Sequence, residues 1–115
     1  MDTFPYNGTT TTCDALWMGV PVVTLCGLLR SSRISSSILN QIGLSELIAN
    51  SSREYIKISV TLANSMSQLR EMREQLRSKI INSSLYDNKN VTKQFEDAIR
   101  LEWKRICERE NYVEQ

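Results

Sequence analysis

Residues 1–26, MDTFPYNGTTTTCDALWMGVPVVTLC, decide the fold of this chain. The opening residues are extended and lead through a Pro, Asn and Gly turn into four consecutive threonines. The threonines begin an apolar helical run, which Gly19 and Pro21 end. The next stretch, Val22–Leu25, predicts a buried strand. This order of strand, Gly/Thr turn, helix start and strand is typical of sites that bind nucleotide phosphates.

The start of the predicted helix has two interpretations. The first amides of a helix lack intrahelical partners, and the helix dipole is positive there, so a phosphate can approach a turn built from Gly and small hydroxyl residues. Alternatively, Thr11-x-x-Asp14 before an apolar run fits a capping pattern, in which the threonines only close the helix end. The stretch matches neither the Walker pattern nor G-x-G-x-x-G, because Gly8 is the only glycine before Gly19 and no suitably spaced lysine follows it.

The stretch Asn7–Leu25, NGTTTTCDALWMGVPVVTL, with MDTFPY before it, resembles the donor-binding segment of the protein O-GlcNAc transferase and SPINDLY family of glycosyltransferases. Weaker similarity continues to about Trp103. The resemblance implies a GT-B type α/β fold, in which two Rossmann-like lobes enclose the nucleotide sugar. The chain would be the C-terminal part of the second lobe and mostly helical after residue 50, and we expect it to be a portion of a larger protein.

The resemblance also implies site residues. In O-GlcNAc transferases the equivalent stretch reads Asn-Gly-His-Thr-Thr and ends in Asp, and it holds the donor diphosphate and the ribose. The implied diphosphate-binding residues here are Gly8, Thr9, Thr10 and Thr11, and Asp14 would reach the ribose. Thr9 replaces the histidine of those enzymes. Threonine is closer to the SPINDLY side of the family, which includes protein O-fucosyltransferases that use GDP-fucose.

The implied activity is transfer of GlcNAc from UDP-GlcNAc to Ser or Thr of proteins. The alternatives are a SPINDLY-type O-fucosyltransferase, a degenerate scaffolding paralogue, and a non-catalytic helical interaction module whose Gly/Thr turn is only a cap. We assign no catalytic residue, because the chain has no histidine to act as a base and the acid–base residues of the family lie upstream. Protein acceptors would be held by upstream regions. The segment alone is expected to be inactive, and neither a cofactor nor a metal is implied.

The composition argues against several classes of protein. A net charge of +1 gives no support to a nucleic-acid or membrane-surface binder. The longest apolar run, near 20–29, is interrupted and too short to span a bilayer, and no secretory signal is visible. Three widely spaced cysteines predict buried, unpaired thiols in a reducing compartment. We expect the cytoplasm and, in a eukaryote, the nucleus as well.

The two halves of the chain differ in pattern but are expected to form one incomplete domain. Residues 1–50 would be a partial Rossmann-like donor-binding segment, with strands at 1–3, 22–25 and 47–49. Between the last two strands, Ser31 and Ser32 predict a helix start, and Gly43 ends that helix after Ile42. Arg33 would lie in its first turn, either exposed or ion-paired, or in contact with an acidic ligand or a neighbouring segment.

Residues 51–115 contain no Gly or Pro and predict helices that pack on the same lobe. Ser51-x-x-Glu54 is a capping box, and the helix that follows to about Ser65 would bury a broad apolar face. Apolar spacings of three and four predict two further helices, at 66–80 and 91–106, with mixed charges on solvated faces. With so little sheet in the chain, Phe95 and Trp103 are expected to pack on parts of the lobe outside it.

Overall fold

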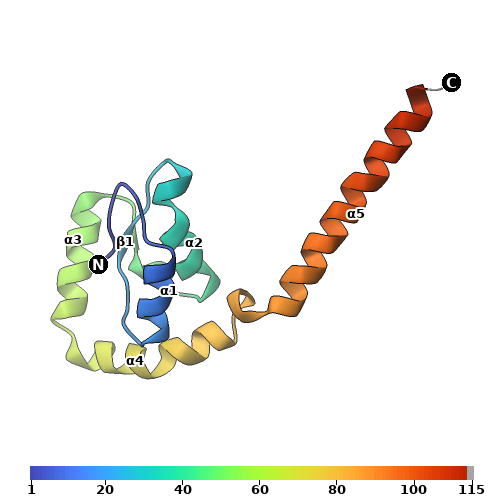
Figure 1. Ribbon diagram of the computed structural model, residues 1–115. Coiled ribbons are helices and arrows are strands. Elements are labelled where there is room, and N and C mark those ends of the chain that lie inside the picture. Colours follow the sequence, from blue (N-terminus) through green and yellow to red (C-terminus); the bar gives the residue numbers. More distant parts are fainter. Residues whose placement is uncertain (114–115) are drawn as a thin grey trace.

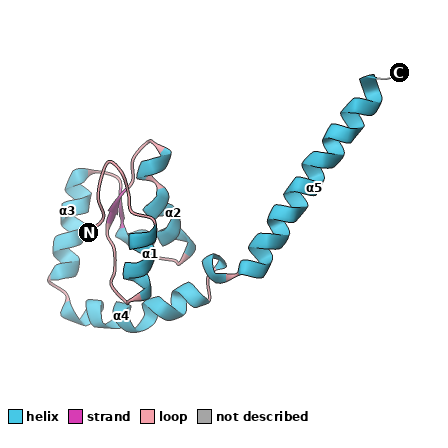
Figure 2. Cartoon of the chain, viewed as in Figure 1, coloured by secondary structure: helices cyan, strands magenta, loops and turns pink. Residues whose placement is uncertain are grey.

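A computed structural model of the chain describes residues 1–113 and consists of helices around a small sheet (Figures 1 and 2). The helices are α1 (Thr10–Trp17), α2 (Ile34–Gln41), α3 (Ser52–Ala63), α4 (Met66–Ile81) and α5 (Asn88–Val113). Three short 3₁₀ turns are η1 (Arg30–Ser32), η2 (Ser45–Leu47) and η3 (Ser84–Tyr86). The strands are β1 (Thr24–Leu25) and β2 (Ile48–Ala49), and they pair in parallel. The α/β prediction with mainly helical structure after residue 50 is confirmed at this level.

The sheet is smaller than the sequence predicted. Within the predicted strand 22–25, only Thr24 and Leu25 pair with β2, in register with Ile48 and Ala49. Val22 and Val23 precede them and are buried without belonging to the strand. The predicted strand at 1–3 is absent as a strand, although the Asp2 N–H donates to the Val23 carbonyl at 2.9 Å. The opening residues therefore lie alongside the chain that enters β1.

The core lies between the sheet and helices α1 to α4. Leu39 of α2 and Ala49 of β2 are fully buried in it. The buried apolar residues are Leu16, Val22, Val23, Ile38, Leu39, Ile42, Leu44, Leu47, Ala49, Tyr55, Leu62 and Leu76. All of them come from residues 16–76, so none of the α5 side chains whose burial is described, residues 88–109, contributes.

Two glycines end helices, as predicted. Gly19 follows α1 with φ +76°, and Gly43 follows α2 with φ +71°, a conformation that favours glycine. At Gly19 there is also no room for a side chain, since a Cβ would lie 2.9 Å from the Arg73 carbonyl oxygen. This close approach brings α4 beneath the C-terminal end of α1 (Figure 1).

The predicted start of α2 at Ser31 and Ser32 is wrong by about two residues. Both serines belong to η1, and Arg33 is the N-cap of α2. The Ser32 hydroxyl donates to the Leu29 carbonyl at 2.8 Å, so it closes the preceding turn and does not cap the helix.

The capping box of α3 is confirmed. The Ser51 hydroxyl accepts the Glu54 N–H at 3.2 Å, and the Glu54 carboxylate accepts the Asn50 N–H at 2.8 Å. The broad buried face predicted for this helix is wrong, because Ile56 and Val60 are exposed. Only a stripe of residues spaced three or four apart can face one core from a single helix, and these two lie outside it.

Trp17 joins α1 to η3 through an aromatic contact and to α4 through a cation–π contact. Trp17, at the end of α1, stacks on Tyr86 of η3 with ring centroids 6.0 Å apart. The Arg77 guanidinium of α4 lies 4.5 Å from the centre of the Trp17 ring. Because a cation over an indole face is attracted by its quadrupole, this cluster fixes α4 against α1.

The predicted third helix is α5, which projects away from the rest of the molecule (Figure 1). From Asn88 to Arg109 its side chains are exposed, apart from a half-buried Cys107. Phe95 is 66% exposed and Trp103 65% exposed. Surface ion pairs such as Arg105–Glu102 confirm the solvated charged face. No helix within residues 1–113 combines the length and the apolar character that crossing a membrane requires.

Candidate functional site at the start of α1

The first turn of α1 is open at its N-terminal end. Its N-cap residue, Thr9, makes no side-chain capping hydrogen bond, and Thr9, Thr10 and Thr11 are exposed. The first helical N–H groups have no intrahelical partner, and the dipole makes this end positive. The predicted cap at Thr11 is wrong, because Thr11 already lies within the helix. The alternative in which these threonines only close the helix end therefore loses its support.

Gly8 precedes this turn and leaves space for it. A Cβ at Gly8 would lie 2.5 Å from the Thr11 hydroxyl oxygen and 2.9 Å from that of Thr12. Both distances are shorter than real Cβ contacts, so any larger residue would displace these two hydroxyls. The Gly8 N–H itself is occupied, because it donates to the Asp2 carboxylate at 2.9 Å. Gly8 therefore allows the turn to pack closely on Thr11 and Thr12, while the available donors follow it.

Thr12 differs from the other three threonines because it is buried. Its Oγ1 lies 3.0 Å from the Ser35 Oγ of α2, and Ser35 donates its own proton to the Gly8 carbonyl at 2.8 Å. Since a serine hydroxyl has one proton, Thr12 is the donor in the first of these bonds. The Thr12 hydroxyl therefore joins α1 to α2 and is not available to a ligand.

Asp2 supports the turn from behind. Its Oδ1 accepts the N–H groups of Thr3 and Gly8, each at 2.9 Å, and its Oδ2 accepts the Thr24 hydroxyl of β1 at 2.8 Å. Its carbonyl oxygen accepts the Tyr55 hydroxyl of α3 at 2.7 Å. Burial and the Asp2 charge raise the pKa of Tyr55, while the hydrogen bond to Asp2 opposes this. One residue thus connects the turn with β1 and α3.

Asn7 fixes the other side of the turn. Its side chain is fully buried, and its Nδ2 donates to the Thr3 carbonyl at 3.0 Å. Its main-chain N–H donates to the Ser31 carbonyl at 2.9 Å. Its Oδ1 is buried and has no partner among the residues that the structure describes. Asn7 therefore ties the entry segment to the loop before α2.

Asp14, the predicted ribose-binding residue, lies one turn further along α1 and is exposed. Residues three and four apart share a helix face, so Asp14 is on the side of Thr10 and Thr11. Cys13 beside it is also exposed, against the prediction of buried thiols, while Cys26 and Cys107 are half-buried. Desolvation of its sulfur and then the Asp14 charge raise the pKa of Cys13, so its thiol is not activated as a nucleophile.

The structure thus brings together every site residue that the sequence predicted, namely Gly8, Thr9, Thr10, Thr11 and Asp14. The sequence reasoning missed Asp2, Asn7 and Ser35, which hold the turn. No periodic pattern marks them. For Asp2 alone there is a local signal. It lies in the extended segment 1–3, which leads into the turn at Gly8.

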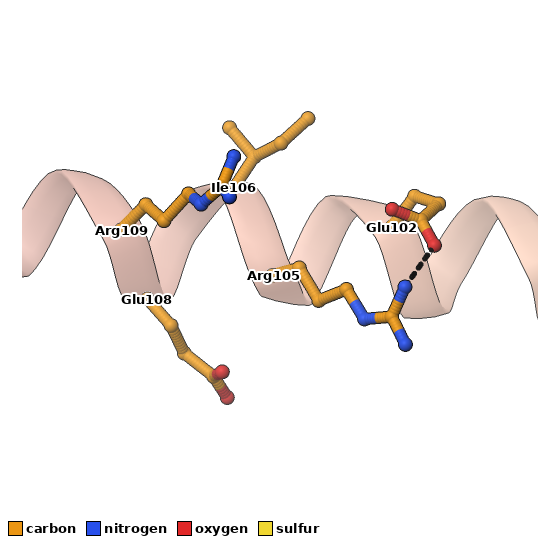
Figure 3. Close-up of a pocket in the computed structure, with 5 residues that line it drawn as sticks. All are labelled: Glu102, Arg105, Ile106, Glu108 and Arg109. Carbon is orange, nitrogen blue, oxygen red and sulfur yellow. Dashed lines mark hydrogen bonds and ion pairs between the residues drawn. The ribbon is translucent and has the colours of Figure 1, made fainter.

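Two other hollows are poorer candidates. A groove of about 610 Å³ beside α2 and β2 is lined by polar residues that include Arg33, Ser36 and Asn50, and Arg33 forms no ion pair within the described residues. A second hollow is lined by Glu102, Arg105, Ile106, Glu108 and Arg109 (Figure 3). All five residues come from α5 alone, so this hollow has no opposite wall.

Nothing in the described part of the chain forms a metal site. Within residues 1–113 no group of three or more His, Cys, Asp and Glu side chains could hold a metal ion. Along Gly8–Asp14 there is also no lysine or arginine. Charge for an anion at this site would therefore come from the main-chain amides and the helix dipole.

Comparison with known proteins gives consistent matches. The family model described as glycosyl transferase family 41 matches residues 1–95. The barley (Hordeum vulgare) protein named probable UDP-N-acetylglucosamine–peptide N-acetylglucosaminyltransferase SPINDLY is 42% identical over 108 residues, which are 94% of this chain and 11% of that protein. The Caenorhabditis elegans UDP-N-acetylglucosamine–peptide N-acetylglucosaminyltransferase is 36% identical over 105 residues, 91% of this chain and 9% of that protein.

A solved structure agrees with these relatives. The structure of a Thermobaculum terrenum O-GlcNAc transferase mutant matches with a TM-score of 0.84 and 43% identity, over 93% of this chain and 21% of that one. The resemblance seen in the first 26 residues is confirmed. The chain spans 9% to 12% of the length of the curated relatives that it matches.

Proposed function

The chain belongs to glycosyl transferase family 41, and from this we propose that it forms the donor-binding part of a protein O-GlcNAc transferase. In this proposal the donor is UDP-GlcNAc and the acceptors are Ser or Thr hydroxyls of proteins. The names of the relatives support this assignment, since they describe peptide N-acetylglucosaminyltransferases. The acceptor protein would be held by regions that the match to this chain does not cover.

The observation that carries the proposal is the open first turn of α1. Thr9, Thr10 and Thr11 are exposed, the N-cap side chain leaves the helix amides unoccupied, and Gly8 allows the tight turn that precedes them. We propose that the two donor phosphates accept hydrogen bonds from these amides and from the exposed hydroxyls. Asp14, on the same helix face, would accept a hydrogen bond from a ribose hydroxyl.

In glycosyl transfer the bond from the sugar to the diphosphate breaks, and negative charge develops on the leaving diphosphate. Fixed amides aimed at that charge stabilise the transition state without reorganising. The chain would contribute this stabilisation, while the base that accepts the acceptor proton would come from another segment. The proposal includes no metal and no other cofactor.

The proposed architecture is a Rossmann-like lobe of a two-lobed, GT-B type enzyme. Residues 1–50 would supply the donor-binding end of that lobe, and residues 51–115 the helices that complete it. The apolar side of α5, with Phe95 and Trp103, would pack on parts of the protein outside this chain. We propose a cytoplasmic location and, in a eukaryote, a nuclear one as well.

The proposal can be tested by measuring UDP binding to the chain by calorimetry. The double variant Thr10→Ala, Thr11→Ala should weaken binding by roughly 1–3 kcal/mol, because it removes hydrogen bonds to a charged ligand. The free energy of unfolding of the double variant should change less, since losing a helix-capping side chain costs about 1 kcal/mol. Thr61→Ala, at an exposed position of α3, is the matched control and should bind normally. Unchanged UDP affinity in the double variant would contradict the proposal.

Thr9 gives a specific reason to test a second donor. The His-to-Thr difference at this position is the feature that favours GDP-fucose and a SPINDLY-type O-fucosyltransferase. The same calorimetric titration with GDP distinguishes the two candidate donors, UDP-GlcNAc and GDP-fucose. Tighter binding of UDP than of GDP supports the GlcNAc donor, and the reverse order supports the fucose donor.

A further inference from the structure

Asp2 accepts more hydrogen bonds than its neighbours and touches both the proposed donor site and the rest of the core. Its carboxylate accepts from Thr3, Gly8 and Thr24, and its carbonyl oxygen accepts from Tyr55. Its own N–H donates to the Val23 carbonyl at 2.9 Å. The residue is therefore anchored to β1 and α3, two elements outside the turn.

We propose that Asp2 is the positioning residue of the donor-diphosphate site. This inference rests on the proposed function. The Gly8 amide is the last main-chain donor before the α1 N-cap, and Asp2 fixes its direction from β1. By holding Gly8, Asp2 sets how far the Thr9–Thr11 segment stands from the phosphates. It touches no substrate itself.

The contacts of Asp2 indicate that it acts through the geometry of its hydrogen bonds and not through its negative charge. A negative carboxylate behind a site for a dianion opposes binding, so its charge cannot be the reason for its presence. The N–H groups of Thr3 and Gly8 require an acceptor oxygen at one fixed point, and the Thr24 hydroxyl, which can donate or accept, requires a hydrogen-bond partner at a second. An asparagine can meet this need, because its oxygen can face Thr3 and Gly8 while its NH₂ donates to the Thr24 hydroxyl oxygen.

The expected results therefore depend on geometry. In the full 115-residue chain, kept well below its unfolding temperature, Asp2→Ala should weaken UDP binding by about tenfold or more, as expected for a loosened set of charged hydrogen bonds. Asp2→Asn should bind UDP as tightly as the unchanged chain or more tightly. Asp2→Glu keeps the charge but displaces both oxygens by one methylene, and it should also weaken binding.

The matched control is Tyr55→Phe, which removes the bond to the Asp2 carbonyl and leaves the carboxylate contacts in place. It should lower the unfolding temperature and leave UDP affinity within about twofold. Amide shifts of Gly8 in NMR spectra give a second measurement. The Gly8 signal should move in Asp2→Ala and stay close to its place in Tyr55→Phe.

Three outcomes would overturn the inference. The first is UDP affinity in Asp2→Ala within twofold of the unchanged chain, and the second is an equal loss in Asp2→Ala and Tyr55→Phe. If Asp2→Ala does not fold, Asp2→Glu decides, and unweakened binding in that variant overturns the inference. In all three cases the proposed function stands if the unchanged chain binds UDP at Gly8–Asp14. If the unchanged chain shows no saturable binding, both proposals fail.

Discussion

Residues 1–50 and helix α5 use their apolar side chains in opposite ways. In the first region, residues such as Leu39 are fully buried and surround a small parallel sheet, and the proposed donor site rests on that core. In α5, apolar side chains such as those of Leu101 and Trp103 are 52% and 65% exposed. The difference indicates that residues 1–50 share a packed core with α3 and α4, whereas α5 presents its apolar side chains at the surface.

The largest expected effect is a loss of stability, and the same Leu-to-Ala substitution compares it between the two regions. Leu39→Ala should destabilise the chain by about 2–5 kcal/mol, because it removes a fully buried side chain from a packed core. Leu101→Ala, at an exposed position of α5, should change stability by less than about 0.5 kcal/mol. Chemical denaturation followed by circular dichroism measures both. Similar losses would show that α5 is packed in solution and would contradict the comparison.

The next effect concerns glycines. Gly8→Ala should weaken UDP binding by about 1.5–3 kcal/mol, because its Cβ would displace the Thr11 and Thr12 hydroxyls. Gly43→Ala has open space around the Cβ but a positive φ, so it should cost about 1–2 kcal/mol of stability and leave binding unchanged. Calorimetric titration and thermal unfolding of both variants test this. If Gly43→Ala loses as much affinity as Gly8→Ala, the close approach at Gly8 has no special role.

The sequence predicted the start of α1 well because its signals are local, while the binding role of the residues there stays a prediction. A glycine followed by small hydroxyl residues and an apolar run marks a helix start without any knowledge of distant residues, and α1 begins at Thr10. The ends of α1 and α2 were likewise predicted by Gly19 and Gly43.

The contacts behind the turn could not be predicted, because they join residues far apart in the chain. Thr24 and Tyr55 meet Asp2 across separations of 22 and 53 residues, and nothing local marks those partners. The start of α2 was misplaced for a similar reason. Serines favour N-cap positions in general, but here the Ser32 hydroxyl is used by the Leu29 carbonyl.

A smaller effect is expected at Tyr55. Because its pKa is raised in the folded chain, the folded state holds this proton more tightly than the unfolded state does. The resulting stability is fully present below the ordinary tyrosine pKa of about 10 and is lost as the pH rises through the raised value. Tyr55→Phe should cost about 0.5–1.5 kcal/mol at neutral pH, through the lost bond to Asp2.

The test of this pH dependence is the unfolding temperature between pH 8 and pH 11. The unchanged chain should lose more stability over this range than Tyr55→Phe, which has no phenol to titrate at this position. Parallel curves would mean that the Tyr55 proton is not linked to folding.

The smallest effect is expected from removing α5. A chain that ends at Asp87 keeps every buried apolar residue of the core, so its unfolding temperature should stay within about 4 °C of the full chain. Thermal unfolding followed by circular dichroism measures this. A large loss would show that α5 supports the core and that its apolar side is covered in solution.

The most direct test of the account is an NMR titration of the isotope-labelled chain with UDP. We expect saturable shifts confined to the amides of Gly8–Asp14 and to their immediate partners, Asp2 and Ser35. Amides of α5 should not move. Shifts centred on α5, or an absence of saturable shifts at Thr9–Thr11, would contradict the claim that the open start of α1 holds the donor diphosphate.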